Sequence, residues 1–229
     1  MIDPNANFVF SGATTNINVP TFPDSFNHRS GTTNFNIYYK SSKPLTFTAG
    51  IVNFLQSAEL GSLTLNGASL YGTEVNITDS FTVLGTSKVY GSSTVTPCYL
   101  NLLPSCVTSW TGSDNIVSNI IMNNYGYIFY NTTVAALGMR ITANAVFINN
   151  GVFNVSSPGN INLNSGSTTI FYEFVNNGFV YVYMTSGRIF DIKTKFTNNG
   201  DVQIITGNLL YLFLLCIYLL FLLKTINLI

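Results

Sequence analysis

The chain repeats an Asn-Asn-Gly triplet at intervals that constrain its fold more than any other feature. The triplets begin at Asn149, Asn176 and Asn198, and a looser copy, Asn-Asn-Tyr-Gly, begins at Asn123. The intervals are 26, 27 and 22 residues. Self-similarity at periods of about 20–50 residues is typical of solenoids and other repeat architectures. The second half of the chain is therefore predicted to be a stack of similar units.

The residues on both sides of each triplet alternate between apolar and mixed character. A phenylalanine lies two residues before each triplet, at Phe147, Phe174 and Phe196, and Ile121 takes this place in the loose copy. The residues two and four positions after each glycine are also apolar: Phe153 and Val155, Val180 and Val182, Val202 and Ile204, and Ile128 and Tyr130 in the loose copy. Alternation of period two predicts half-buried strands. The predicted unit is a strand, an Asn-Asn-Gly corner and a second strand.

The corner chemistry fits two architectures. Glycine adopts positive φ without a Cβ clash, and asparagine tolerates such positions and bonds to nearby backbone. If the units stack, Asn149, Asn176 and Asn198 lie one strand spacing apart, and their amides can hydrogen-bond along the stack. The same triplet is also a hairpin signal in an antiparallel sandwich. The matching flanks favour the stacked solenoid.

The first half repeats more faintly, and it sets the predicted domain bounds. Leu70-Tyr71-Gly72 is echoed 19 residues later by Val89-Tyr90-Gly91. No convincing helical period occurs between residues 1 and 207. The sequence predicts an all-β, right-handed parallel β-helix over residues 44–207. Residues 1–43 are expected to be an irregular lead-in or a partial first coil.

The C-terminal segment 208–229 differs abruptly in composition. Leu209 to Leu223 is a run of 15 apolar residues, followed by Lys224. As a helix this run would rise only about 22 Å, whereas segment 209–229 would approach the roughly 30 Å hydrocarbon thickness, with the lysine near a headgroup. We expect a transmembrane helix that makes the membrane a partner. The alternatives are a hydrophobic cap on the last coil or translated non-coding sequence.

The predicted compartment rests on glycosylation sequons. The start of the chain has no cationic n-region followed by an apolar h-region. Sequons nevertheless begin at Asn76, Asn131 and Asn154, and the repeat pattern places Asn154 on the outward face. We therefore expect an incomplete N-terminus and an extracellular ectodomain. The alternative is a tail-anchored protein that faces the cytosol.

The cysteines allow two interpretations. Cys98 and Cys106 flank a short proline-containing stretch, and a disulfide between them would staple a loop between coils. Such a bridge would fit an oxidising compartment. Cys216 lies in the apolar tail. The alternative is that all three cysteines are unpaired.

Charged residues are sparse along the whole chain. Only 8% of the residues are charged and the net charge is zero, which gives no electrostatic footprint for nucleic acid. The acidic residues of the central region stand singly: Asp79, Asp114, Glu173, Asp191 and Asp201. Asp191 and Lys193 share one strand face and predict a surface ion pair. The chain has one histidine and no metal-ligand or cofactor motif, so we expect no metal, no cofactor and no enzymatic activity.

Aromatic residues are the strongest functional lead. Phe179, Tyr181 and Tyr183 fall on the face opposite Val180 and Val182. Tyr127 and Phe129 fall on the same side of the loose repeat. Aromatic faces on a rigid solenoid can stack on sugar rings or peptide, so these residues are the predicted binding site for a glycan or a cell-surface protein. The alternative is that a loop or further coils cover this side.

The Phe-x-Asn-Asn-Gly units, over about residues 118–205, resemble repeats in the N-terminal β-helix of fungal hyphally regulated cell-wall adhesins. They are also similar to Asn-rich β-solenoid surface proteins of amoeboid protists. The resemblance implies cell-surface display and adhesion, and it carries no catalytic residues. We therefore expect a non-enzymatic adhesion or structural ectodomain. The alternatives are a carbohydrate-binding or degenerate carbohydrate-active β-helix, and a fragment of a longer surface protein.

Overall fold

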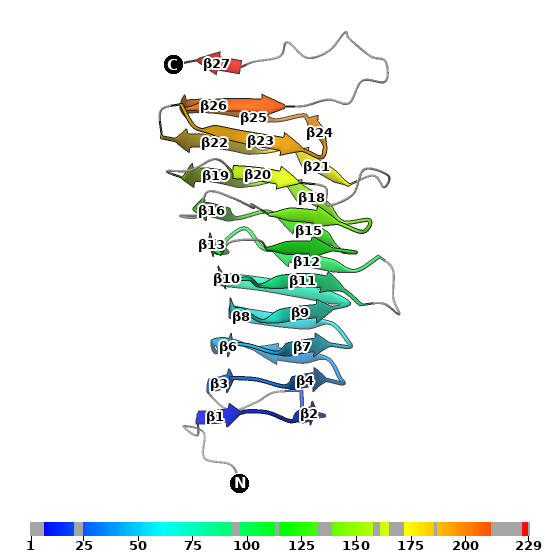
Figure 1. The fold of residues 1–229 in the computed structure, drawn as a ribbon. Helices are drawn as coiled ribbons and strands as arrows, with labels where there is room; N and C mark the ends of the chain where they lie inside the picture. Colours follow the sequence, from blue (N-terminus) through cyan, green and yellow to red (C-terminus); the bar gives the residue numbers. More distant parts are fainter. Residues whose placement is uncertain are drawn as a thin grey trace.

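The chain forms a parallel β-solenoid (Figure 1). The computed structural model describes residues 7–20, 25–92, 97–112, 115–131, 139–157, 161–164, 172–185, 187–211 and 226–228. The regular elements in these ranges are strands, and strands of successive coils pair in parallel. Figure 1 shows the coils stacked from the N-terminal end to the C-terminal end. The predicted all-β parallel solenoid is confirmed, and the antiparallel sandwich is not the fold.

Each coil passes through three faces in the order face 1, face 2, face 3. Face 1 contains β1 (Asn7–Phe10), β3 (Ser25–His28), β6 (Leu45–Phe47), the second parts of β8 (Ala58–Asn66) and β10 (Glu74–Leu84), β13 (Val107–Trp110), β16 (Tyr127–Asn131), β19 (Val152–Ser157), β22 (Phe179–Met184), β25 (Asp201–Thr206) and β27 (Ile226–Leu228). Face 2 is a separate sheet of ten strands: β2 (Thr14–Ile17), β4 (Thr32–Phe35), β7 (Ile51–Phe54), β9 (Ser69–Gly72), β11 (Lys88–Gly91), β14 (Ile116–Ser118), β17 (Arg140–Thr142), β20 (Ile161–Asn164), β23 (Ile189–Lys193) and β26 (Asn208–Tyr211). Face 3 contains β5 (Tyr39–Ser41), the first parts of β8 and β10, β12 (Tyr99–Leu102), β15 (Ile121–Asn124), β18 (Val146–Asn149), β21 (Glu173–Asn176) and β24 (Lys195–Asn198). Faces 1 and 3 join into one sheet because β8 and β10 run through the corner between them.

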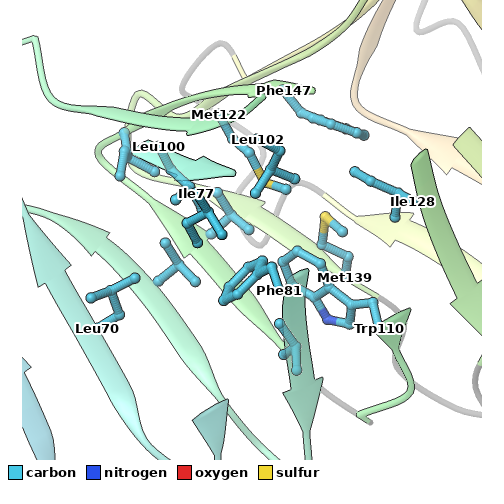
Figure 2. Packing of buried hydrophobic residues seen from close by; sticks show 14 of the residues in the cluster. Leu70, Ile77, Phe81, Leu100, Leu102, Trp110, Met122, Ile128, Met139 and Phe147 are labelled. Carbon is cyan, nitrogen blue, oxygen red and sulfur yellow. The ribbon is translucent and has the colours of Figure 1, made fainter. Parts of the chain in front are cut away.

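One continuous hydrophobic core fills the interior of the stack. Inward side chains alternate with outward ones along each strand, so Phe81, Ile77 and Leu102 are fully buried. Figure 2 shows side chains from several coils, Leu70, Ile77, Phe81, Leu100, Leu102, Trp110, Met122, Ile128, Met139 and Phe147, packed together. Burying each large apolar side chain contributes about 1.5–3 kcal/mol.

The phenylalanines before the triplets stack on one another along the solenoid. The rings of Phe147 and Phe174 lie 5.0 Å apart between centroids and within 7° of parallel. The ring of Phe196 continues the column at 5.1 Å from Phe174. This column fixes the distance between coils from inside the core.

The first asparagines of the triplets form the predicted ladder inside the corner. Asn149 Nδ2 donates to Asn176 Oδ1 at 2.8 Å, and Asn176 Nδ2 donates to Asn198 Oδ1 at 2.8 Å. The ladder reaches the loose copy through Asn124, whose Nδ2 donates to Asn149 Oδ1 at 2.7 Å. The alignment from Asn123 was therefore wrong by one residue, because the glycines are the aligned positions. The core position paired with Phe147 is accordingly Met122.

The glycine of each corner is needed for a close backbone approach. A Cβ atom on Gly151 would overlap the carbonyl oxygen of Gly126, and one on Gly178 would overlap that of Gly151. These glycines are not among the residues with positive φ. The expected role of positive φ was wrong for these triplets.

The stacked coils extend beyond the predicted bounds of the solenoid. Strands β1 to β5 already pair in register with the following coils, starting from Asn7. At the other end, Asn208–Tyr211 forms β26 and pairs with β23, so the first residues of the predicted tail belong to a strand. Residues 212–225, which include the rest of the apolar run, lie outside the described residues. In the part of the chain that the structure describes, no helix has the length and apolar character needed to span a bilayer.

The predicted disulfide is not formed in the structure. Cys98 and Cys106 are both buried, and no disulfide joins them. The Cys98 thiol lies 3.6 Å from the carbonyl oxygen of Ser92, and the Cys106 thiol lies 3.8 Å from Thr108 Oγ1. The two thiols are therefore packed separately in the interior, each with its own polar neighbour.

Candidate functional site

The outward aromatic residues lie in register on face 1. Strand β19 pairs with β16 on one side and with β22 on the other. This pairing aligns Tyr127, Val152 and Phe179 in one row across the coils, and Phe129, Asn154 and Tyr181 in the next. A third row contains Asn131, Ser156 and Tyr183. We call the outward side chains of these three rows the aromatic face.

The predicted site residues come together on this face. Phe179 is 43% exposed and Tyr183 is 40% exposed, while Tyr181 between them is partly exposed. The rings of Phe179 and Tyr181 lie 6.2 Å apart and within 4° of parallel, and Tyr181 and Tyr183 lie 6.5 Å apart. The outward register predicted for all three residues is confirmed.

Two further outward aromatic side chains lie on β16, in the coil before β19. Tyr127 is 50% exposed and Phe129 is 46% exposed on β16. The sequence placed both of them on this side. The aromatic face therefore has two aromatic strands, β16 and β22, with one strand between them that carries none outward.

The strand between them forms the floor of a surface hollow. The outward side chains of β19 in the second and third rows are Asn154 and Ser156, which are smaller than the rings on either side. A shallow hollow of about 410 Å³ opens here and is lined by Phe129, Tyr130, Asn131, Asn154, Ser156 and Tyr183. The hollow thus combines aromatic sides with amide and hydroxyl groups.

The Asn154 side chain differs from the asparagines that form ladders between coils. Its neighbours in register are Phe129 and Tyr181, which offer no amide to continue a ladder. On face 3, by contrast, Asn123 Nδ2 donates to Asn101 Oδ1 at 2.8 Å. Within the described residues Asn154 makes no side-chain hydrogen bond, so its amide remains able to bond a ligand.

The three sequons have different surroundings. Asn131 and Asn154 both line the hollow. Asn76 lies on face 3, where its Oδ1 accepts a hydrogen bond of 2.8 Å from Asn101. A glycan on Asn154 or Asn131 would therefore emerge within the aromatic face, whereas one on Asn76 would emerge from a different side of the solenoid.

Several carboxylates away from the aromatic face are held in ion pairs. Lys40 Nζ lies 2.7 Å from Glu59 Oε2, and this hydrogen bond lowers the pKa of the Glu59 carboxyl. Burial alone would raise the pKa of Glu173, but hydrogen bonds from Thr197 and Lys195 outweigh it and lower that pKa. Such carboxyls stay ionised at neutral pH.

The ion pair that the sequence predicted is formed on face 2. Lys193 Nζ lies 3.2 Å from Asp191 Oδ2. Its environment is less open than expected, because Asp191 is buried. The strand alternation places the two side chains together, and burial of the aspartate was not visible from that alternation.

Among the described residues, no three histidine, cysteine, aspartate or glutamate side chains come close enough to hold a metal ion. Comparison with protein-family models, with curated proteins and with solved structures found no match.

Proposed function

We propose that this protein is a non-enzymatic cell-surface adhesion protein whose solenoid presents the aromatic face to its partner. The observation that carries the proposal is the grouping of Tyr127, Phe129, Phe179 and Tyr183, each at least 40% exposed, on one face of the stack. Contiguous exposed apolar surface is unfavourable in water and commonly marks an interaction site. Tyrosine rings add a polar group to this surface, which suits a partner that is partly hydrated.

The rigidity of the solenoid supports the same role. The aromatic side chains are attached to strands whose inward neighbours, such as Val180 and Val182, are buried in the core. Both neighbouring coils hold each of these strands in register. A surface that is ordered before contact loses little conformational entropy on binding.

The carboxylates support a non-enzymatic role. Paired-carboxylate hydrolysis needs one acid with a raised pKa close to a second carboxylate. Glu59 and Glu173 instead have lowered pKa values and cationic partners. Asp191 has its own cationic partner in Lys193. These groups act as structural ion pairs in the proposal.

The proposal includes a membrane-anchored, extracellular arrangement with right-handed coils. The right-handed winding rests on the strong preference of parallel strand crossovers for that hand. The anchor rests on the apolar run Leu209–Leu223. Because β26 and β27 at its two ends pair with the stack, insertion of this run into a membrane requires both strands to leave the solenoid. With a signal peptide attached, the full chain should stay with membranes after alkaline carbonate extraction and carry a glycan that Asn154→Gln removes. An unglycosylated, extractable product would overturn this arrangement.

The adhesion role can be tested with the full chain in detergent micelles, coupled to beads through an N-terminal tag. The beads should adhere to eukaryotic cell surfaces, and the double variant Tyr127→Ala/Phe179→Ala should reduce the number of adherent beads at least about tenfold, as expected when hot-spot aromatic residues are removed. Tyr71→Ala is the matched control, because Tyr71 lies outward on face 2 and stacks on Tyr90. Equal adhesion by the double variant would overturn the proposal, as would cleavage of a polysaccharide by the wild-type chain.

A carbohydrate-binding solenoid is the second candidate function. The hollow between Phe129 and Tyr183 is the observation that favours it, because a sugar presents both apolar ring faces and hydroxyl groups.

A further inference from the structure

We infer that the hollow over β19 is a binding site for a neutral saccharide. This inference rests on the proposed adhesion function and names the chemistry of the partner for molecules whose Asn154 carries no glycan. The site is smaller than the aromatic face as a whole: it consists of Phe129 on β16, Asn154 and Ser156 on β19, Tyr183 on β22 and Asn131 at the end of β16.

The spacing of the walls fits a sugar ring. Phe129 and Tyr183 belong to strands on opposite sides of β19, and Tyr183 lies one row further along, so two strand spacings and a two-residue offset separate their backbones by roughly 12 Å. An aromatic ring contacts a sugar ring at about 3.5–4 Å between carbon atoms, so this separation leaves room for one sugar ring between the two side chains. The apolar face of a sugar can therefore lie against an aromatic wall above the short side chains of β19.

The floor supplies the polar half of the recognition. Asn154 and Asn131 offer amide donors and carbonyl acceptors, and Ser156 offers a hydroxyl that both donates and accepts. Sugar hydroxyls need partners of both kinds when they leave water. The Asn154 amide is not engaged by a described neighbour, so binding a sugar breaks no existing bond of the stack.

The electrostatic character of the site selects against charged ligands. The residues that line the hollow include no aspartate, glutamate, lysine, arginine or histidine. An acidic sugar would leave its carboxylate without a cationic partner, and an amino sugar would leave its ammonium group without an anionic one. A neutral saccharide leaves no charge unpaired.

The site is preorganised by the core beneath it. Tyr130, Phe153 and Val155 alternate with the site residues on β16 and β19, and all three are fully buried. These inward side chains lock the strands that carry Phe129, Asn154 and Ser156. The hollow therefore keeps its shape without a ligand, which favours binding.

The test uses the unglycosylated full chain, produced in bacteria and kept in detergent micelles. Retention is measured on cellulose, chitin, β-1,3-glucan and mannan, with polygalacturonate as the charged comparison. At least one neutral polysaccharide should retain the protein, and polygalacturonate should not. Phe129→Ala and Tyr183→Ala should each weaken retention about tenfold, as loss of a stacking ring at a small site does.

Tyr125→Ala is the matched control, because Tyr125 is 44% exposed but does not line the hollow. This variant should be retained like the wild type, and all variants should keep the wild-type melting temperature. The saccharide site would be overturned if the protein were retained on polygalacturonate alone or on none of the polysaccharides. It would also be overturned if the Phe129 and Tyr183 variants were retained as strongly as the wild type. If beads still adhere to cells through Tyr127 and Phe179 in that case, the adhesion function stands without the saccharide site.

The chain's own glycan is the competing occupant, and a second preparation distinguishes it. Protein made in a secretory pathway and glycosylated at Asn154 should lose retention on the neutral polysaccharide, because the attached sugar occupies the same hollow. Undiminished retention of that glycoprotein would overturn the assignment of the site to this hollow.

Discussion

Asn149 uses both protons of its side-chain amide to hold the next coil in place. Its Nδ2 donates to Asn176 Oδ1 at 2.8 Å and to the carbonyl oxygen of Phe179 at 3.0 Å. Asn176 repeats the arrangement toward Asn198 and the carbonyl oxygen of Asp201. The corner is thus joined to its neighbour through a side chain as well as through the backbone, and both asparagines are fully buried.

Asn176→Ala should destabilise the solenoid more than Asn177→Ala. The first substitution leaves Asn149 Nδ2 without its partner inside the corner, at a cost of about 1–3 kcal/mol. The second removes Asn177 from an exposed ladder, in which its Nδ2 donates to Asn150 Oδ1 at 2.9 Å and water can replace the bond. Thermal melts of the two full-length variants measure the difference, and equal or reversed losses would contradict the ladder assignment.

Gly178→Ala should be more harmful than Gly187→Ala. A Cβ atom on Gly178 collides with the carbonyl oxygen of Gly151, so neighbouring coils must separate, at about 2–4 kcal/mol. Gly187 has open space around its Cβ position and only a φ of +76° to accommodate, which costs about 1–2 kcal/mol. Chemical denaturation of both variants measures the two losses in free energy of unfolding, and so compares the cost of the backbone collision with the cost of the strained φ. A smaller loss for Gly178→Ala would show that the corner can relax.

Acidification should destabilise the folded chain through His28. This residue is the only histidine, is fully buried and lies 5.8 Å from Phe47 between ring centroids. Burial lowers the pKa of its imidazole, and an interaction with the backbone of Ala49 only partly opposes that shift. The unfolded chain therefore binds the proton more readily, so stability falls as the pH drops below the unfolded pKa of about 6.5.

Melting temperatures at pH 7 and pH 5.5 measure this effect, in a window above the titration of ordinary carboxyls. His28→Phe should remove most of the pH dependence, because Phe10 and Phe47 occupy the same position in the neighbouring coils. An unchanged pH dependence in this variant would assign the effect to other groups.

The thiols of Cys98 and Cys106 should react slowly in the folded protein. Both are buried, and burial raises the pKa of each thiol, which keeps them protonated and unreactive. Iodoacetamide labelling followed by peptide mapping should modify both only after denaturation. A reducing agent should leave the melting temperature unchanged. A mass lower by two hydrogen atoms, or a melting temperature that falls on reduction, would show that the disulfide forms after all.

The triplets carried most of the information about the fold. A repeated glycine marks a place where two backbones touch, and that requirement is local, so Gly151 and Gly178 could be aligned from the sequence alone. In the loose copy only the residues before the corner were misplaced, because they were counted from its first asparagine, Asn123, whereas the residues after the corner were counted from Gly126 and have the predicted register. The early coils were missed for a related reason: they have no triplet, although Thr-Thr-Asn at residues 14–16 recurs at residues 32–34 and pairs with it in the structure.

The candidate site was only half visible in the sequence. Alternation within one strand places Phe179, Tyr181 and Tyr183 outward without any knowledge of neighbouring coils. The hollow depends on which side chains lie beside them in the next coil, and coil lengths vary between these positions. Counting positions from the glycines places Asn154 between Phe129 and Tyr181, and that alignment was the signal from which the hollow could have been predicted.

The parallel pairing of successive coils determines how the molecule would respond to mechanical load. The hydrogen bonds between coils run along the axis of the stack, so a force that pulls its two ends apart acts on every interface in series, and the weakest interface opens first. Each interface that opens would release one coil, from the 17 residues that separate Ala58 and Val75 in register to the 29 that separate Ile161 and Phe190. A tether of this kind lengthens in steps and keeps the remaining coils folded. Stepwise extension in force spectroscopy would be its signature, and a single all-or-none rupture would contradict it.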